Sequence, residues 1–212
     1  FAYCLGAESL TIWKDVSGVL NADPREFKDP QLLEQISYEE TIEMAFYGAS
    51  VIHPKTIKPI QNKKIPLIVR SFKNLNSKGT KVTNKAEMIP HVPCYIVKKN
   101  QVLVSIASLD FSFIVEENIS EIFKLFHKYQ LKVNLIQNSA ISFSVCLDNN
   151  LNHFDQFFNE IKVMYNVSFV KNVDLFTVRH FNENSLSKIY NLGTSLLSQI
   201  NKSTAQVIIQ KE

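Results

Sequence analysis

The sequence predicts a mixed α/β fold in which an α/β segment precedes two smaller units of sheet and helix. Three observations support this fold class. Strand-like and helix-like segments alternate up to about residue 83. From 102 to 171 the predicted order is β-α-β-β-α-β, and a β-α-β pattern begins again after 172. A chain of 212 residues is long enough for one or two domains of ordinary size.

In the first part, local signals mark each element. A short buried strand is expected at 9–13, and a strand at 65–72. Ser37 followed three residues later by Glu40 is a capping box, which predicts a helix from there to Gly48. Pro54 suits the first turn of a further helix over 54–62.

In the second part, apolar periodicity distinguishes helices from strands. Ile119, Ile122, Phe123 and Phe126 share one helical face, which predicts a helix at 118–130. Two further helices are expected, at 151–161 and 184–200. Strands are expected at 95–98, 102–107, 131–136, 141–147, 167–170, 173–179 and 205–210.

The β-α-β-β-α-β order is the ferredoxin-like motif, and about 70 residues suffice for one copy. The sequence therefore predicts one copy at 100–171. A second, split copy would use 92–99 and 172–212, so that the first copy is inserted into the second. Residues 1–83 would form the preceding α/β part.

Composition narrows the functional class. The net charge of +3 and the presence of only three arginines argue against nucleic-acid binding. Apolar runs are too short to span a bilayer, so no membrane partner is expected. Three scattered cysteines predict neither a disulfide framework nor a metal site. This lysine-rich, cysteine-poor composition favours the cytoplasm.

Several segments then resemble one family. Residues 13–25, WKDVSGVLNADPR, are similar to the segment YTDVDGVYTADPR of aspartokinases. Residues 36–40 and 44–54, ISYEE and MAFYGASVIHP, resemble the family's ISYxE and AxxGAKVLHP motifs. Residues 65–72 and Gly79-Thr80 resemble its VPLxVRS…GT pattern. The predicted fold is thus the C-terminal piece of an amino-acid-kinase α/β domain followed by two ferredoxin-like ACT regulatory domains.

The resemblance implies an aspartate kinase, which uses ATP and Mg²⁺ to phosphorylate the side-chain carboxylate of L-aspartate on the route to lysine, threonine and methionine. The family's KFGGTS and GRGGSD segments, which supply phosphate and aspartate contacts, do not occur in this sequence. No catalytic residue is therefore assigned within it, and those residues are expected on a preceding part of the parent protein. Phosphoryl transfer depends on positioning and charge neutralisation, so this chain alone is expected to be inactive.

The resemblance also places an ATP site in the first part. Its residues, by the family pattern, are Lys14, Asp15, Leu20, Arg25, Ser50 and Val51. A guanidinium at Arg25 suits phosphate oxygens. Ser50 replaces a family lysine, and Leu20 a family tyrosine. The alternative from the residues alone is that Asp15 and Asp23 only cap turns.

ACT domains bind the end-product amino acid, here lysine or threonine, between a strand-to-helix loop and a facing strand. By resemblance the effector-binding residues are Phe111, Asn118, Ile119, Val133, Asn134, Gln137 and Asn138. Asn134 stands where lysine-sensitive members often have aspartate, which removes a charge that could meet a lysine ammonium. The alternative is that Gln137 and Asn138 only build a hairpin turn.

Three further expectations complete the sequence-based interpretation. His53 is interpreted as a structural residue at a helix start, and Cys94 and Cys146 as small packing residues. Exposed edges of two small sheets favour a homodimer through the ACT domains. The competing functional class is a non-catalytic amino-acid-binding regulator with a kinase remnant. The tail after Val207 shows no linker, so a fused dehydrogenase is not expected.

Overall fold

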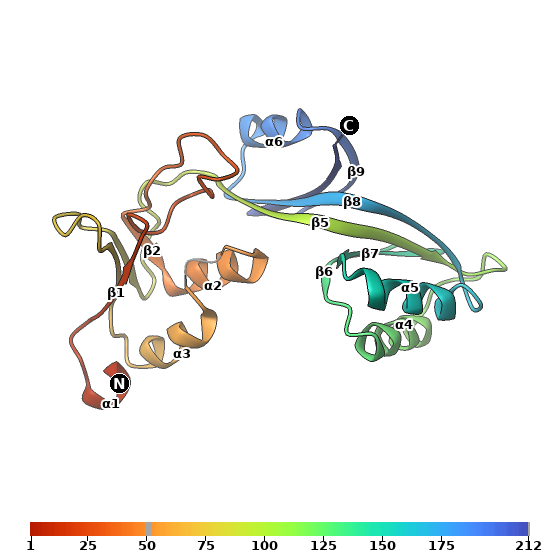
Figure 1. Ribbon diagram of the computed structural model, residues 1–212, viewed down its shortest axis with the longest axis horizontal. Coiled ribbons are helices and arrows are strands. Elements are labelled where there is room, and N and C mark those ends of the chain that lie inside the picture. Colours follow the sequence, from red (N-terminus) through yellow and green to blue (C-terminus); the bar gives the residue numbers. More distant parts are fainter. Residues whose placement is uncertain (50–51, 212) are drawn as a thin grey trace. The chain divides into compact units, whose positions relative to one another are not determined.

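The computed structural model describes residues 1–49 and 52–211, and these residues contain two β-sheets (Figure 1). The elements of the first part run in this order: α1 (Ala2–Leu5), β1 (Leu10–Lys14), β2 (Gln35–Ser37), α2 (Tyr38–Tyr47), α3 (Pro54–Asn62), β3 (Leu67–Ser71) and β4 (Thr80–Thr83). The four strands form a sheet in the order β1-β3-β4-β2. Strands β1 and β3 are parallel, so their carboxyl ends lie at the same edge.

Side-chain caps start the two longer helices of this part where the sequence predicts them. The Ser37 hydroxyl accepts a hydrogen bond from the Glu40 backbone N–H at 3.0 Å, and Gly48 caps the C-terminus of α2 after Tyr47. His53 caps α3 through Nδ1, which accepts from the Lys55 N–H at 3.2 Å. The structural interpretation of His53 is therefore confirmed. Both helices contribute to a core that includes Leu33, Ile36, Met44, Ile57 and Leu67.

The remaining elements follow the predicted order over most of their length. They are β5 (Cys94–Ala107), α4 (Glu116–Lys128), β6 (Val133–Asn138), β7 (Ser142–Asp148), α5 (Leu151–Ile161), β8 (Asn166–Arg179), α6 (Glu183–Tyr190), β9 (Thr194–Ile200) and β10 (Thr204–Gln210). The strands belong to a six-stranded sheet in the order β6-β7-β5-β8-β10-β9.

Two details of the predicted elements are wrong. The helix expected at 184–200 ends at Tyr190, and β9 follows after Gly193. A side chain at 193 would approach the Gln210 carbonyl oxygen to 2.4 Å, so glycine is required beside β10. The strands expected at 95–98 and 102–107 are one strand, β5, and those at 167–170 and 173–179 are one strand, β8. Asn100 and Asn172 adopt left-handed backbone angles without ending either strand.

By its internal contacts the chain divides into two units. Unit 1 comprises 1–97, 177–188 and 200–205, and unit 2 comprises 98–176, 189–199 and 206–212. In unit 2, α4 and α5 lie together on one face of the strands β5, β6 and β7 (Figure 1). Their shared core includes Val104, Ile122, Phe126, Phe143 and Phe157. The unit boundaries fall inside β5 and β8, so the domain bounds 1–83, 100–171 and 92–99 with 172–212 stay a prediction.

Candidate functional site

The candidate nucleotide residues lie on the segment that leaves the carboxyl end of β1. Lys14 is the last residue of this strand, and its carbonyl accepts a hydrogen bond from the Phe72 N–H at 2.9 Å. Asp15 follows with an exposed side chain. Leu20, further along, is half-buried and forms a β-bridge with Leu32. Ligands of α/β sheets often bind at the carboxyl ends of parallel strands, which is where this segment begins.

Arg25 has its guanidinium in solvent. Its side chain is 80% exposed and forms a two-pronged ion pair with Asp23, with Nη2 at 2.6 Å from Oδ2. This hydrogen bond raises the pKa of Arg25. Asp23 also accepts from the Arg25 backbone N–H, which is the turn-capping role considered for it. Ser50 and Val51, the other candidates for this site, lie outside the described residues.

The first three effector candidates lie in and beside the start of α4. Phe111 has a positive φ of 60° and a ring that is 81% exposed. Asn118 is internally engaged, because its Oδ1 accepts from the Val115 N–H and its Nδ2 donates to the Tyr165 hydroxyl. Ile119 packs against the core of unit 2. Of these three, the exposed Phe111 has the side chain most open to solvent.

Asn134 lies at the centre of a polar cluster. The register of β6 against β7 slips between Val133 and Leu135, so Asn134 is the extra residue of a β-bulge. Its Nδ2 donates to Gln101 Oε1 at 2.7 Å and to Asp148 Oδ1 at 2.6 Å. Its Oδ1 accepts from Lys98 Nζ at 2.8 Å. Bulges redirect side chains and are common beside functional sites.

The other candidates on β6 differ in exposure. Val133 is half-buried against the core, whereas Gln137 and Asn138 are exposed. The hairpin turn is closed by the Ser139 N–H, which donates to the Ser142 carbonyl at 2.8 Å. Gln137 and Asn138 precede that turn and pair in β6 with Ser144 and Phe143. They therefore belong to the strand, and their side chains extend from it.

Sequence reasoning missed three members of this cluster, namely Lys98, Gln101 and Asp148. One signal could have found Lys98, because it continues the alternation of Cys94 and Ile96 on a buried side of the strand. A lysine in such a position requires a polar partner. No comparable pattern marks Gln101, which is 4% exposed.

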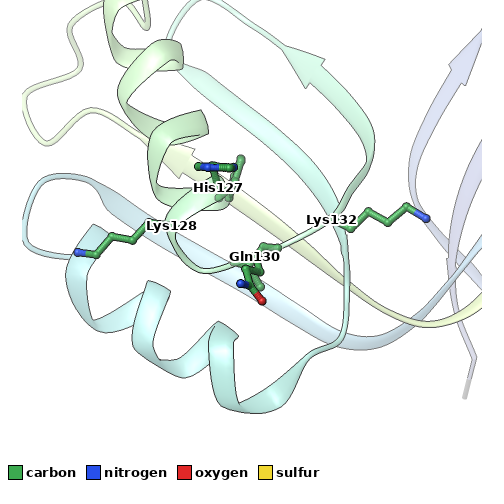
Figure 2. A pocket seen from close by; sticks show the side chains of 6 residues that line it. His127, Lys128, Gln130 and Lys132 are labelled. Carbon is green, nitrogen blue, oxygen red and sulfur yellow. The ribbon is translucent and has the colours of Figure 1, made fainter.

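A separate pocket lies at the C-terminal end of α4 (Figure 2). Its lining includes His127, Lys128, Gln130 and Lys132, and none of the candidate residues. Figure 2 shows Lys128 and Lys132 extending away from each other, so their charges do not converge on one point. Lys128 lies in the last helical turn, where a cation interacts favourably with the helix dipole. The helix dipole therefore explains a basic residue at this place without a ligand.

Burial suppresses thiol chemistry at two of the three cysteines. It raises the pKa of both Cys94 and Cys146 to about 12, so neither forms a thiolate near neutral pH. Their interpretation as packing residues is confirmed, since both are buried, whereas Cys4 is exposed. Within 1–49 and 52–211, no group of three or more His, Cys, Asp or Glu residues is placed to hold a metal ion. No helix in these ranges has the length and apolar character needed to cross a membrane.

Comparison of the sequence with those of known proteins identifies related proteins. Residues 1–71 match the amino acid kinase family. The chain is 33% identical over 147 residues to the lysine-sensitive aspartokinase 3 of Escherichia coli, covering 69% of this chain and 32% of that protein. It is 46% identical over 79 residues to a bifunctional aspartokinase/homoserine dehydrogenase of Buchnera aphidicola, covering 37% of this chain and 10% of that protein.

Solved structures show the same fold. The aspartate kinase of Clostridium acetobutylicum superposes with a TM-score of 0.85 at 20% identity, covering 99% of this chain and 52% of that one. Aspartokinase III of E. coli, in complex with lysine and aspartate, superposes with a TM-score of 0.78 at 23% identity, covering 98% and 49%. The chain thus spans about a third of the first curated relative and about half of the solved chains. The solved structures show that the chain shares their fold. The sequence matches show that the chain belongs to the aspartokinase family.

Proposed function

We propose that this chain is part of an aspartate kinase, which transfers the terminal phosphoryl group of ATP to the side-chain carboxylate of L-aspartate. The observation that carries the proposal is the 147-residue similarity to an aspartokinase, together with the amino acid kinase match over 1–71. A purely regulatory protein is not favoured, because the kinase-like part is the part that the family model recognises.

The residues proposed for ATP are Lys14, Asp15, Leu20 and Arg25, with Ser50 and Val51. Phosphoryl transfer requires positioned cations around the phosphates, and Mg²⁺ is the expected metal partner of ATP. The Arg25 guanidinium is exposed and forms an ion pair with its neighbour Asp23. It can therefore exchange this surface ion pair for phosphate oxygens at small energetic cost.

The regulatory part is proposed to bind an end-product amino acid, lysine or threonine, at the seven residues named for the effector. Support comes from the exposure of Phe111, Gln137 and Asn138 and from the redirected side chain of Asn134 at the bulge. The E. coli relative is named for its sensitivity to lysine. We also propose that the protein works in the cytoplasm as a homodimer that pairs through its ACT domains.

Measurement of ADP release tests the kinase assignment. The full-length parent protein should release ADP in a manner that requires L-aspartate, ATP and Mg²⁺. The 212-residue chain alone should show no turnover, because its sequence lacks the glycine-rich phosphate segments of the family. A parent protein without aspartate-dependent ADP release would contradict the proposed activity, and clear turnover by the chain alone would contradict its expected inactivity.

A further inference from the structure

Building on the effector site proposed above, on which this step depends, we propose that Lys98 determines which amino acid the site accepts. Its ammonium donates to the side-chain oxygen of Asn134, so a second ammonium at this oxygen would meet a like charge. The site therefore favours an amino acid with an uncharged side chain, such as threonine, and disfavours lysine.

The hydrogen-bonding capacity of Asn134 is largely used within the chain. A primary amide has two N–H donors and one acceptor oxygen with two lone pairs. Both donors are taken, by Gln101 Oε1 and Asp148 Oδ1. A lysine ammonium can only donate and a carboxylate of Asp148 can only accept, so these two partners fix which end of the amide faces which group. This oxygen has a second lone pair, but an incoming ammonium that used it would lie beside the Lys98 ammonium and be repelled by it.

The charges around Asn134 also disfavour a positively charged ligand side chain. Lys132 is close enough to disfavour the charge of Lys98, and Asp148 is a carboxylate that favours it. Burial, followed by the repulsion from Lys132, lowers the pKa of Lys98, while Asp148 and Cys146 act in the opposite direction. The local balance is therefore already positive. A third ammonium there lacks a carboxylate of its own, whereas an uncharged side chain meets no such repulsion.

Lys98 is positioned firmly enough to exert this effect. It lies on β5, and it is half-buried rather than extended into solvent. Its partner Asn134 is fixed on the bulge of β6 by two further hydrogen bonds, to Gln101 of β5 and Asp148 of β7. Side chains from three strands of one unit therefore fix the position of the Lys98 ammonium. A charge at a fixed position can discriminate between ligands better than a mobile surface charge can.

Isothermal titration of the 212-residue chain tests the proposal. The ligands are L-threonine, L-lysine and L-norleucine, which has the carbon skeleton of lysine without its side-chain ammonium. The proteins are wild type, Lys98→Met and, as a matched loss of one positive charge, Lys124→Met on the exposed side of α4. Thermal unfolding followed by circular dichroism verifies that each variant is folded.

In wild type we expect threonine to bind at least about tenfold more tightly than lysine, since unscreened repulsion of one charge is of that size. Lys98→Met should tighten lysine binding about tenfold or more. It should change threonine and norleucine binding less than threefold, and Lys124→Met should change none of the three. Lys98→Arg, which keeps the charge, should still disfavour lysine.

Other outcomes separate the two proposals. Wild type that prefers lysine, or a Lys98→Met variant that is folded and leaves lysine affinity unchanged, overturns the role of Lys98 while the effector site stands. Wild type that binds neither threonine nor lysine overturns the effector site itself, and the role of Lys98 with it. If Lys98→Met does not fold, the affinities of the wild type and of Lys98→Arg for threonine and lysine still test the role of Lys98.

Discussion

At the scale of single residues, Arg179 shows how a buried charge is held. It lies at the end of β8 and is 8% exposed. Nε and Nη2 donate to the two carboxylate oxygens of Glu40, both at 2.8 Å. Nη1 donates to Glu43 and to the Thr204 hydroxyl. The sequence predicts Glu40 as part of a helix cap, and its backbone N–H fulfils that role, but nothing local indicates that its carboxylate meets a residue 139 positions away.

We expect Arg179→Met to destabilise the protein by about 3–5 kcal/mol, because it removes the guanidinium that makes two hydrogen bonds to the buried Glu40 carboxylate. The double variant Arg179→Met/Glu40→Leu should lose less, since it removes both charges. Urea unfolding of the single and double variants measures the difference. The solvent-exposed ion pair between Arg25 and Asp23 provides the control. Arg25→Met should leave the urea midpoint of unfolding unchanged. Equal losses in the single and double variants would contradict this account.

The same ion pair gives stability a pH dependence. Burial alone would raise the pKa of Glu40, but the hydrogen bonds and charge of Arg179, assisted by His180, hold it below its ordinary value of 4.5. A lowered folded-state pKa adds stability above the unfolded value and loses it as pH falls through the folded value. Below pH 4.5 the wild type should therefore lose stability more steeply than Glu40→Gln.

At the scale of elements, local sequence signals predict where a helix begins better than they predict how far a helix or strand extends. Ser37 and Pro54 mark helix starts through caps and backbone angles, and both helices begin there. The helix expected at 184–200 fails because β10 offers an edge to 194–200, which no local signal reports. Asn100 and Asn172 resemble turn residues, yet both strands continue through them because cross-strand pairing outweighs one left-handed residue.

The sequence also indicated only some of the candidate-site residues. The family resemblance indicated the segment around Lys14 and the strand around Asn134 as candidates. It could not give Lys98, because its contact with Asn134 depends on a bulge whose register is set by the pairing of two strands. Local periodicity can indicate that Lys98 lies on a partly buried side of its strand, but it does not indicate that Asn134 is its partner.

Gly79 tests the close approach of β3 and β4. Its φ is 70°, and a Cβ there would lie 2.0 Å from the Val69 carbonyl oxygen. Gly79→Ala should therefore destabilise the protein by at least about 1 kcal/mol more than Gly6→Ala. Gly6 shares a positive φ of 61° but has nothing within 4 Å, so it isolates the steric clash from the backbone strain. Thermal unfolding of both variants compares them, and equal shifts would contradict the clash.

At the scale of the whole molecule, β6 and β9 are the outer strands of the six-stranded sheet. Outer strands present unpaired backbone groups that favour association with another chain. Sedimentation velocity should therefore show a dimer, consistent with the proposed pairing through ACT domains. Ile136→Lys, which places a charge on β6, should weaken it. Val163→Lys, after α5 and 74% exposed, is the matched control and should not. A monomeric wild type would contradict the proposal.

The burial of two thiols has a practical consequence for handling the protein. Cys94 and Cys146 are enclosed and remain protonated at ordinary pH, while Cys4 is open to solvent near the first residue. A maleimide dye added to the folded chain therefore has Cys4 as its single target. The 212-residue chain offers one attachment point for a spectroscopic label without any substitution, and the two enclosed sulfurs become reactive only when their cores open.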